Sequence, residues 1–491
     1  MDHRDDSRPE WGKSVSKVCL LPQRVVLVLM GFFSLICAFT CRVSLSHAIT
    51  ILAISNKISN KTIANLTDEA PDGVCQQEVE SKDAVEHIGI YTWSETEKGF
   101  ILGSFYFGYL ISHLPGGVLA DKYGAKWVVA FCVGVTAICE LLSPTSIRLG
   151  PYYLITLRVL MGIAQGPIFP GLNGLLSSWA PKKERATLGT ICFGGSTMGI
   201  ILSNACSGLL LHYYTWPVMF YVFGSLSVIW FFVFAIICTS SPFSHPFITP
   251  KEREYLADEV GNVNKDKPAI PWKPLLLSMP MLSLIVSQMG HDWGYYVMVT
   301  NLPLYMADVI RFSIRSNGFV TALPYVAMWI ASLISGVVAD WLIRSGKLRL
   351  VTVRKLFTLL SAVLPGTFMV AASYAGCDKA LVVALFTISM WTMGMYYAGQ
   401  KLSALDISPS YSSTITAVIN GLGSFTGLFA PPIIGLLTPD KNNTQWRIVF
   451  WASAVILTLS AIVFWLIGSA DIQPYDPMYE KSEKPEENKN K

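Results

Sequence analysis

Long apolar stretches alternate with short polar loops along most of this chain. A helix of about 20 apolar residues crosses the roughly 30 Å hydrocarbon core of a bilayer. Twelve stretches reach about that length, at residues 24–53, 99–120, 127–144, 152–180, 186–213, 216–238, 275–306, 318–342, 356–375, 380–402, 412–437 and 446–468. The pattern predicts an all-α membrane protein with twelve transmembrane helices.

Polar segments divide these spans into two groups of six. We predict a polar N-terminal segment at 1–23, a six-helix bundle at 24–239, a linker at 240–274, a second six-helix bundle at 275–469 and a charged tail at 470–491. Two related six-helix bundles with a binding site between them are a transporter architecture.

Composition agrees with a membrane protein and narrows the chemistry. Of the 491 residues, 52% are hydrophobic and only 14% are charged, whereas soluble domains are about 25% charged. The net charge of +4 is spread over loops, so no nucleic-acid partner is expected. The sequence contains no HExxH motif, nucleophile elbow or cysteine–histidine metal spacing. We therefore expect no enzyme, cofactor or metal site.

Two signals predict the orientation. Sequons occur at Asn60, Asn65 and Asn442, all in loops that follow odd-numbered spans, so we expect glycosylation there. Basic residues cluster in the opposite loops, which the positive-inside rule places in the cytoplasm. These residues are Lys122, Lys126, Lys182, Lys183, Arg185, Arg344, Lys347, Arg349, Arg354 and Lys355. Both termini are then predicted to be cytoplasmic.

A motif repeats between the two halves. "GGVLADKYGAK" follows the second span and "SGVVADWLIRSGK" follows the eighth. The first copy resembles the loop signature of the major facilitator superfamily, which assigns Gly117, Asp121, Gly124 and Asp340 to gating. The alternative is a solvated turn between helices.

Longer segments resemble a narrower family. "WSETEKGFILGSFYFGYLISHLPGG", "GPIFPGLNGLLSSWAPKKERATLG", "GHDWGYYVMVTNLPLYMADV" and "YYAGQKLSALDISP" are similar to the anion:cation symporters, the group of sialin, the vesicular glutamate transporters and the type I sodium–phosphate cotransporters. Within this family, the last two of these segments and "SHPFITPKEREYL" look closest to the insect inorganic phosphate cotransporter branch. The resemblance implies a multi-pass carrier of the plasma membrane or an endolysosomal or vesicular membrane.

The same resemblance implies a function. Sodium-dependent cotransport of inorganic phosphate comes first, and transport of an organic anion of the sialate or glutamate type, driven by protons or by potential, comes second. The partners would be a small anion, a coupling cation (Na⁺, alternatively H⁺) and the bilayer, and we expect a monomer. A receptor that binds without transporting remains a third hypothesis.

Arg42 and Arg158 lie inside predicted spans. Each buried arginine costs roughly 2.5–3.5 kcal/mol at mid-membrane, so both need a compensating role. The planar guanidinium suits carboxylate or phosphate, and the matching arginines of the family lie in the substrate path. We predict that both bind substrate. The alternative is a structural pair, with Glu140 as the nearest acid to Arg158.

The fourth span lacks two acidic residues that the resemblance implies, and the seventh span offers an acidic residue in their place. Sialin-like members carry acids at positions matching Met161 and Gln165, which makes Gln165 a cavity-lining residue here without proton coupling. His291 and Asp292 lie within an apolar helix. We predict that His291 assists the anion and that Asp292 binds the coupling cation, with a structural pair as the alternative.

The remaining candidates have weaker patterns. His47 is assigned to the cavity or to the non-cytoplasmic end of its span, and Tyr296 to the cavity lining or to helix packing. Lys401 and Asp406 are expected to pair at the cytoplasmic end of span ten. Cys75 and Cys377 could both face an oxidising compartment, and the sequence leaves open whether Cys75 forms a disulfide.

Overall fold

A computed structural model describes residues 21–52, 75, 91–181, 184–260, 270–408, 411–477 and 479. The N-terminal half contains α2 (Gln23–Leu52), α4 (Glu95–Tyr123), α5 (Ala125–Leu149), α6 (Pro151–Gln165), α7 (Ile168–Trp179), α8 (Arg185–Tyr213) and α9 (Trp216–Ile237). The connecting segment contains η1 (Pro242–Ser244), α10 (Pro250–Val260) and α11 (Trp272–Leu277). The C-terminal half contains α12 (Met279–Tyr296), η2 (Val297–Asn301), α13 (Leu302–Asp308), α14 (Ile314–Arg344), α15 (Leu350–Tyr374), α16 (Lys379–Met393), η3 (Gly394–Tyr397), α17 (Gln400–Ile407), α18 (Ser412–Leu437) and α19 (Asn443–Ile467).

The all-helical membrane architecture is confirmed, and the span count is confirmed in part. Ten helical segments among the described residues are long and apolar enough to cross a membrane. Two predicted spans, α4 and the interrupted run α12–η2–α13, are not among the ten. For those two segments, crossing of the membrane remains a prediction, and so does the total of twelve.

Three predicted spans are interrupted, which the hydropathy pattern did not indicate. The fourth divides between α6 and α7 at Gly166 and Pro167, where proline has no N–H for the helix ladder. The seventh passes through a π-helical turn, η2, and the tenth through a 3₁₀ turn, η3. Such irregular turns inside helices often occur at functional sites.

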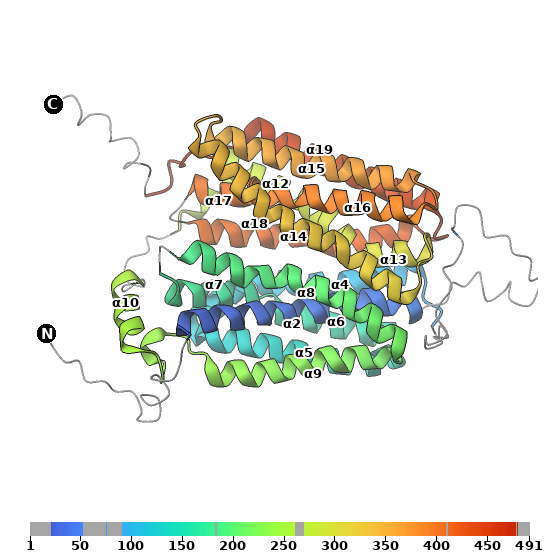
Figure 1. Ribbon diagram of the computed structural model, residues 1–491, viewed down its shortest axis with the longest axis horizontal. Helices are drawn as coiled ribbons and strands as arrows, with labels where there is room; N and C mark the ends of the chain where they lie inside the picture. The colour runs from blue at the N-terminus through green and yellow to red at the C-terminus, as the bar shows by residue number, and fades with distance from the viewer. Residues whose placement is uncertain are drawn as a thin grey trace, which may run out of the picture.

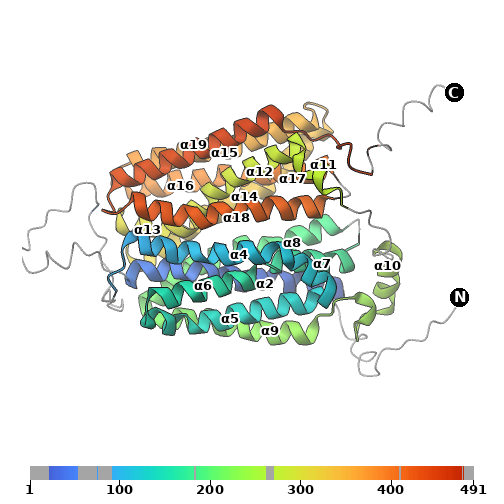
Figure 2. The ribbon, with the colours of Figure 1, turned by 180° about the vertical axis from the view of Figure 1, so that it is seen from behind.

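The two halves lie side by side as two layers, and the long helices of both layers run roughly along the same axis, some in one direction and some in the other (Figure 1). In both views α4 and α18 lie along the boundary between the layers (Figure 2). Small residues allow the close packing typical of membrane helices. A Cβ added at Gly108 would lie 2.0 Å from the carbonyl oxygen of Val159, and one at Gly162 would lie 2.0 Å from that of Phe105. The backbones of α4 and α6 therefore touch.

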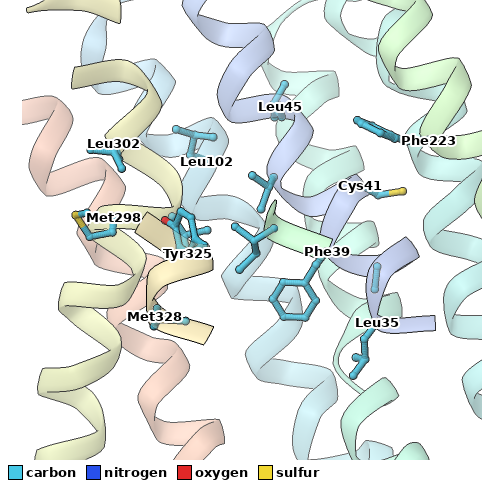
Figure 3. Close-up of a cluster of buried hydrophobic side chains, with 14 of the residues drawn as sticks. Leu35, Phe39, Cys41, Leu45, Leu102, Phe223, Met298, Leu302, Tyr325 and Met328 are labelled. Carbon is cyan, nitrogen blue, oxygen red and sulfur yellow. The ribbon is translucent and has the colours of Figure 1, made fainter. Parts of the chain in front are cut away.

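Apolar side chains on several sides of α2 form a continuous core that reaches into both halves. Figure 3 shows part of this core, with residues of the C-terminal half on one side of α2 and Phe223 on the other. The labelled side chains are Leu35, Phe39, Cys41, Leu45, Leu102, Phe223, Met298, Leu302, Tyr325 and Met328. Since these residues come from both halves, the halves share one packed interior near α2.

One end of the molecule carries α10, and we call it the linker end (Figure 1). There the carboxylate of Glu252 accepts hydrogen bonds from the backbone N–H groups of Gln23 and Arg24, at 2.8 and 3.0 Å. A negative group at a helix N-terminus satisfies unpaired donors and complements the helix dipole. Residue 252 thus caps α2 and holds the connecting segment against the N-terminal half.

The opposite end carries a disulfide between Cys75 and Cys377, and we call it the disulfide end. Cys75 precedes α4, and Cys377 lies between α15 and α16, so the bond joins the two halves. The backbone N–H of Cys75 also donates to the carbonyl of Val309 at 3.0 Å. This answers the question that the sequence left open about Cys75.

The contact between α14 and the N-terminal half is close near the disulfide end. Gly318 and Gly336 are 18 residues apart, which is five helical turns, so they share a face. A Cβ at Gly318 would lie 2.6 Å from the Cα of Gly208 in α8. A Cβ at Gly336 would meet nothing within 4 Å. Close backbone contact along this face of α14 is therefore found at Gly318 and not at Gly336.

Candidate functional site

Arg42 lies inside an enclosure of aromatic rings near the middle of α2. Its side chain is buried, and its guanidinium carbon lies 4.6–5.6 Å from five ring centroids. Ring faces attract a cation at such distances, more strongly when water is excluded. We call this group the aromatic cage, and its members are Phe39, Phe105, Tyr106, Tyr109 and Tyr296.

The guanidinium of Arg42 keeps two buried donors free. Neither Nε nor Nη2 has a hydrogen-bond partner in the described part of the chain. These two N–H groups lie on one edge of the guanidinium, the edge that binds carboxylate or phosphate in a bidentate manner. Because a buried unsatisfied donor costs about 1–3 kcal/mol, an anion bound at this edge would relieve a cost already present in the protein.

Arg158, in α6, is largely occupied by contacts within the protein. Its Nη2 donates to the backbone carbonyl of Arg42 at 3.1 Å, and its Nη1 contacts the sulfur of Met161 at 3.4 Å. Only Nε is buried without a partner among the described atoms. Phe105 lies against both arginines, 4.6 Å from Arg42 and 5.2 Å from Arg158. The two arginines form one cluster, in which Arg42 offers the free edge.

Other predicted residues of the N-terminal half bind backbone or neighbouring helices. The amide of Gln165 donates to the carbonyl of Ala38 in α2 at 3.0 Å, so it ties α6 to α2. The Nε2 of His47 lies 2.7 Å from the side-chain oxygen of Asn204. Asn204 in turn donates to the carbonyl of Thr321 at 3.3 Å. His47 thus belongs to the contact between α2, α8 and α14, on the disulfide-end side of Arg42.

The predicted residues of α12 form a second cluster. The ring of His291 stacks on Tyr396, with centroids 3.6 Å apart and planes 10° apart. The Oδ1 of Asp292 accepts from the amide of Gln288 at 2.8 Å. The side-chain oxygen of Gln288 accepts from the hydroxyl of Tyr396 and from the side-chain amide of Gln400. Amide and phenol groups thus fix His291 and Asp292. The sequence did not indicate Gln288 and Gln400, because uncharged residues in apolar spans give no distinctive signal.

The expected pair between Lys401 and Asp406 is wrong. Asp406 accepts from the Nε of Arg354 at 2.7 Å. Lys401, in α17, donates to the side-chain oxygen of Asn420 at 3.0 Å and lies 5.9 Å from the ring of Tyr396. Lys401 and Asp406 are five residues apart and so point in different directions from their helix. A second cation therefore lies beside the cluster around His291 and Asp292.

The two clusters meet at Tyr296. This tyrosine lies one turn beyond Asp292 on α12, and it supplies the cage ring that comes from the C-terminal half. Its ring centroid lies 4.5 Å from that of Tyr106 in α4. The prediction that Arg42 and Asp292 face a common region from opposite halves is consistent with this contact.

The predicted gating residues are described only in part. Gly124 has a φ of +86°, a conformation that favours glycine, and it makes the turn between α4 and α5. Asp340 is exposed on α14. Gly117 and Asp121 lie in α4, and the surroundings of Gly117 and the side chain of Asp121 are outside the described part. Asn60 and Asn65 lie outside the described residues. Asn442 caps α19, where its side chain accepts from the backbone N–H of Gln445 at 2.9 Å.

Comparisons with known proteins agree with this architecture. The family model described as Major Facilitator Superfamily matches residues 27–431. Human sialin is 33% identical over 96% of this chain and 97% of its own length. A candidate inorganic phosphate cotransporter of Drosophila melanogaster is 33% identical over 94% of this chain and 88% of its own length. Bovine vesicular glutamate transporter 1 is 29% identical, over 94% and 80%.

Solved structures add evidence for the fold. A bacterial homologue of the human lysosomal transporter Spinster, in an inward-facing and occupied conformation, has a TM-score of 0.66 and 12% identity, covering 91% of this chain and 97% of that one. A D-xylose–proton symporter has a TM-score of 0.66 and 11% identity, covering 91% and 98%. At these identities the likeness concerns the fold alone.

Proposed function

This chain belongs to the Major Facilitator Superfamily, in the group of sialin and its relatives, and from that premise we propose that it carries a small anion through a site at Arg42. The observation that carries the proposal is the free edge of Arg42, with Nε and Nη2 buried and unpaired. In a low-dielectric interior such donors attract an anion far more strongly than in water. Five aromatic rings surround the guanidinium and Arg158 adds a second positive charge nearby, so an anion would be the natural partner.

The contact between the halves supports alternating access. Gly208 and Gly318 bring α8 and α14 into close backbone contact at the disulfide end, whereas a Cβ at Gly336 would meet nothing within 4 Å. A carrier of this superfamily rocks its two halves around a fixed central site, so a contact of this kind at one end is expected to open and close during transport.

An organic carboxylate is the substrate class that the cage favours. One guanidinium edge matches one carboxylate, and the ring faces of Phe105, Tyr106 and Tyr109 suit an organic body next to it. Transfer of doubly charged phosphate into such an apolar enclosure costs more than transfer of a monoanion. We therefore place a carboxylate of the sialate or glutamate type first.

Inorganic phosphate is the second candidate, although the sequence placed it first. The Drosophila relative, at 33% identity, carries that function in its name. Arg158 and Lys401 could add positive charge for a more highly charged anion. The coupling cation at Asp292, sodium or a proton, belongs to the same proposal.

Uptake into proteoliposomes tests the proposal. Labelled sialate, glutamate and phosphate would be offered separately, each with an imposed sodium gradient or an imposed proton gradient. We expect concentrative uptake of a carboxylate. Uptake of phosphate alone would favour the second candidate, and binding without uptake of any probe would favour the receptor hypothesis.

Variants of Arg42 connect that activity to the site. Arg42→Lys keeps the charge and loses the two-pronged edge, so we expect it to lose about 2 kcal/mol, or roughly thirtyfold in apparent affinity. Arg148→Lys is the matched control, because Arg148 is exposed at the end of α5. Undiminished uptake by both Arg42→Lys and Arg42→Ala would remove Arg42 from the mechanism.

A further inference from the structure

A buried carboxyl group lies next to the arginine cluster, and the proposed function has not used it. Glu140, in α5, is 1% exposed. Its Oε1 accepts a hydrogen bond of 2.7 Å from the hydroxyl of Ser44 in α2. No arginine, lysine or histidine nitrogen of the described residues lies within 4 Å of it. The carboxyl group is thus sequestered without a direct ion pair.

The groups that face Glu140 are few. Arg158 from α6 interacts with it electrostatically, beyond ion-pair distance. Cys41 from α2 and Cys139 on its own helix are the other titratable neighbours. The remaining helices packed against α5, namely α4, α7 and α9, place no charged side chain against it among the described residues. Among the described residues, Arg158 is thus the charged side chain that interacts with Glu140.

Glu140 is connected to the free edge of Arg42 by two routes. Ser44, its hydrogen-bond donor, follows Arg42 by two residues in α2. Arg158 donates to the backbone carbonyl of Arg42. A change in the charge of Glu140 therefore alters anion binding at Arg42 in two ways. It acts through α2, the helix that carries Arg42, and through the neighbouring guanidinium of Arg158.

The protonation state of Glu140 sets the net charge of the cluster. With Glu140 ionised, the cluster of Arg42, Arg158 and Glu140 carries one net positive charge. With Glu140 protonated, it carries two. Because charges interact strongly away from water, a proton on Glu140 favours the anion at Arg42, and loss of the proton favours its release.

We propose that Glu140 is the proton-binding site that couples proton movement to anion transport. The inference rests on the proposed anion site at Arg42 and deepens it. Proton and anion enter together, and each raises the affinity for the other by the same factor, as linkage requires. Met161 and Gln165 carry no carboxyl group, so Glu140 of the neighbouring helix α5 supplies the buried carboxyl group beside the arginines. Asp292, in the other half, remains the candidate site for sodium.

Two transport modes of the same proteoliposomes test the inference. In exchange mode, labelled anion inside exchanges for unlabelled anion outside without any gradient. In gradient mode, an acidic exterior drives net uptake. The probe is whichever of sialate, glutamate or phosphate the wild-type protein exchanges. We expect Glu140→Gln to retain exchange and to lose the stimulation by the proton gradient. Glu254→Gln, which changes an exposed carboxylate of α10 in the same way, should retain both.

The outcomes separate the two proposals. Absence of exchange for all three probes in the wild-type protein would overturn the anion site itself. Normal exchange together with wild-type proton stimulation in Glu140→Gln would overturn only the role of Glu140. Stimulation of the wild-type protein by sodium and not by protons would overturn it as well.

A second measurement covers the case in which Glu140→Gln fails to fold. The wild-type protein in detergent, in weak buffer with an indicator dye, should take up about one proton for each anion that binds. Its affinity for the anion should fall as the pH rises. Ser44→Ala, which removes the hydrogen bond to the ionised carboxylate, should shift that fall to higher pH. A pH-independent affinity without proton uptake would refute the inference.

Discussion

The rings of Tyr106 and Tyr296 lie 4.5 Å apart between centroids, and they join α4 to α12 directly over the guanidinium of Arg42. One ring comes from each half, so movement of the halves must change the cage. Binding of an anion at Arg42 can therefore change the contact between the halves, and a change in that contact can change the affinity for the anion. Such differential contact with two states is what a ligand needs to shift a conformational equilibrium.

The first prediction concerns Tyr296. Tyr296→Leu removes the ring pair with Tyr106 that joins the halves at the anion site. We expect a loss of about 1 kcal/mol of that contact, seen as a roughly fivefold rise in KM for the transported anion. Tyr296→Phe keeps the ring and should remain close to wild type. Labelled uptake as a function of anion concentration measures both. Equal loss in the two variants would assign the effect to the hydroxyl group and not to the ring.

The second prediction concerns closure at the disulfide end. A methyl group at Gly318 would lie 2.6 Å from the Cα of Gly208 and 2.7 Å from the carbonyl of Asn204. Backbone atoms cannot move aside easily, so Gly318→Ala should hold α8 and α14 apart. We expect slower anion exchange and faster hydrogen–deuterium exchange in the last turns of α8.

Gly336→Ala is the control for that substitution, since it lies on the same face of α14 in open space. Alanine favours a helix over glycine by about 1 kcal/mol, so this variant should be as active as wild type and at least as stable. If Gly318→Ala exchanged anion at the wild-type rate, tight contact at this end would not be required for transport.

The sequence predicted the helices, the family and the two arginines, because long apolar runs and charges within them are local signals. It did not predict which partners the charged side chains bind. Spacing along one helix could not show that Asp406 pairs with Arg354, since the partner lies 52 residues away. Nor could it show that Arg158 bonds the backbone of Arg42. For Glu140 the sequence indicates only a structural pair with Arg158, because the Ser44 contact joins residues 96 positions apart.

The third prediction concerns a charged cluster at the disulfide end. The ammonium of Lys441 lies 3.2 Å from Glu95 of the N-terminal half and 3.1 Å from Asp308 of the C-terminal half. Lys98 also pairs with Glu95, at 2.8 Å. Lys441→Gln would leave Glu95 and Asp308 as facing carboxylates, so we expect a lower Tm and partial recovery in the double variant with Glu95→Gln.

The pH dependence of this cluster follows from Lys441. Burial lowers the pKa of Lys441, but Asp308 and Glu95 together outweigh burial and raise it above its usual value. A raised pKa contributes stability below the unfolded pKa of about 10.4, and that stability is lost only as the pH passes the higher folded pKa. The Tm difference between wild type and Lys441→Gln should therefore be equal at about pH 7 and about pH 9. A difference that shrinks over this interval would contradict the assigned contacts.

The last prediction tests the placement of Asp292. A Cβ at Gly423 in α18 would lie 2.1 Å from the Oδ2 of Asp292 and 2.9 Å from a side-chain carbon of Gln288. Gly423→Ala should displace Asp292 and lower both uptake and Tm, since overpacking costs about 1–3 kcal/mol. Gly189→Ala, which meets nothing within 4 Å, is the control. Adding Asp292→Ser to Gly423→Ala relieves the crowding. If the carboxylate itself is needed, Tm recovers in that double variant and uptake does not, whereas recovery of both would show that Asp292 only fills space.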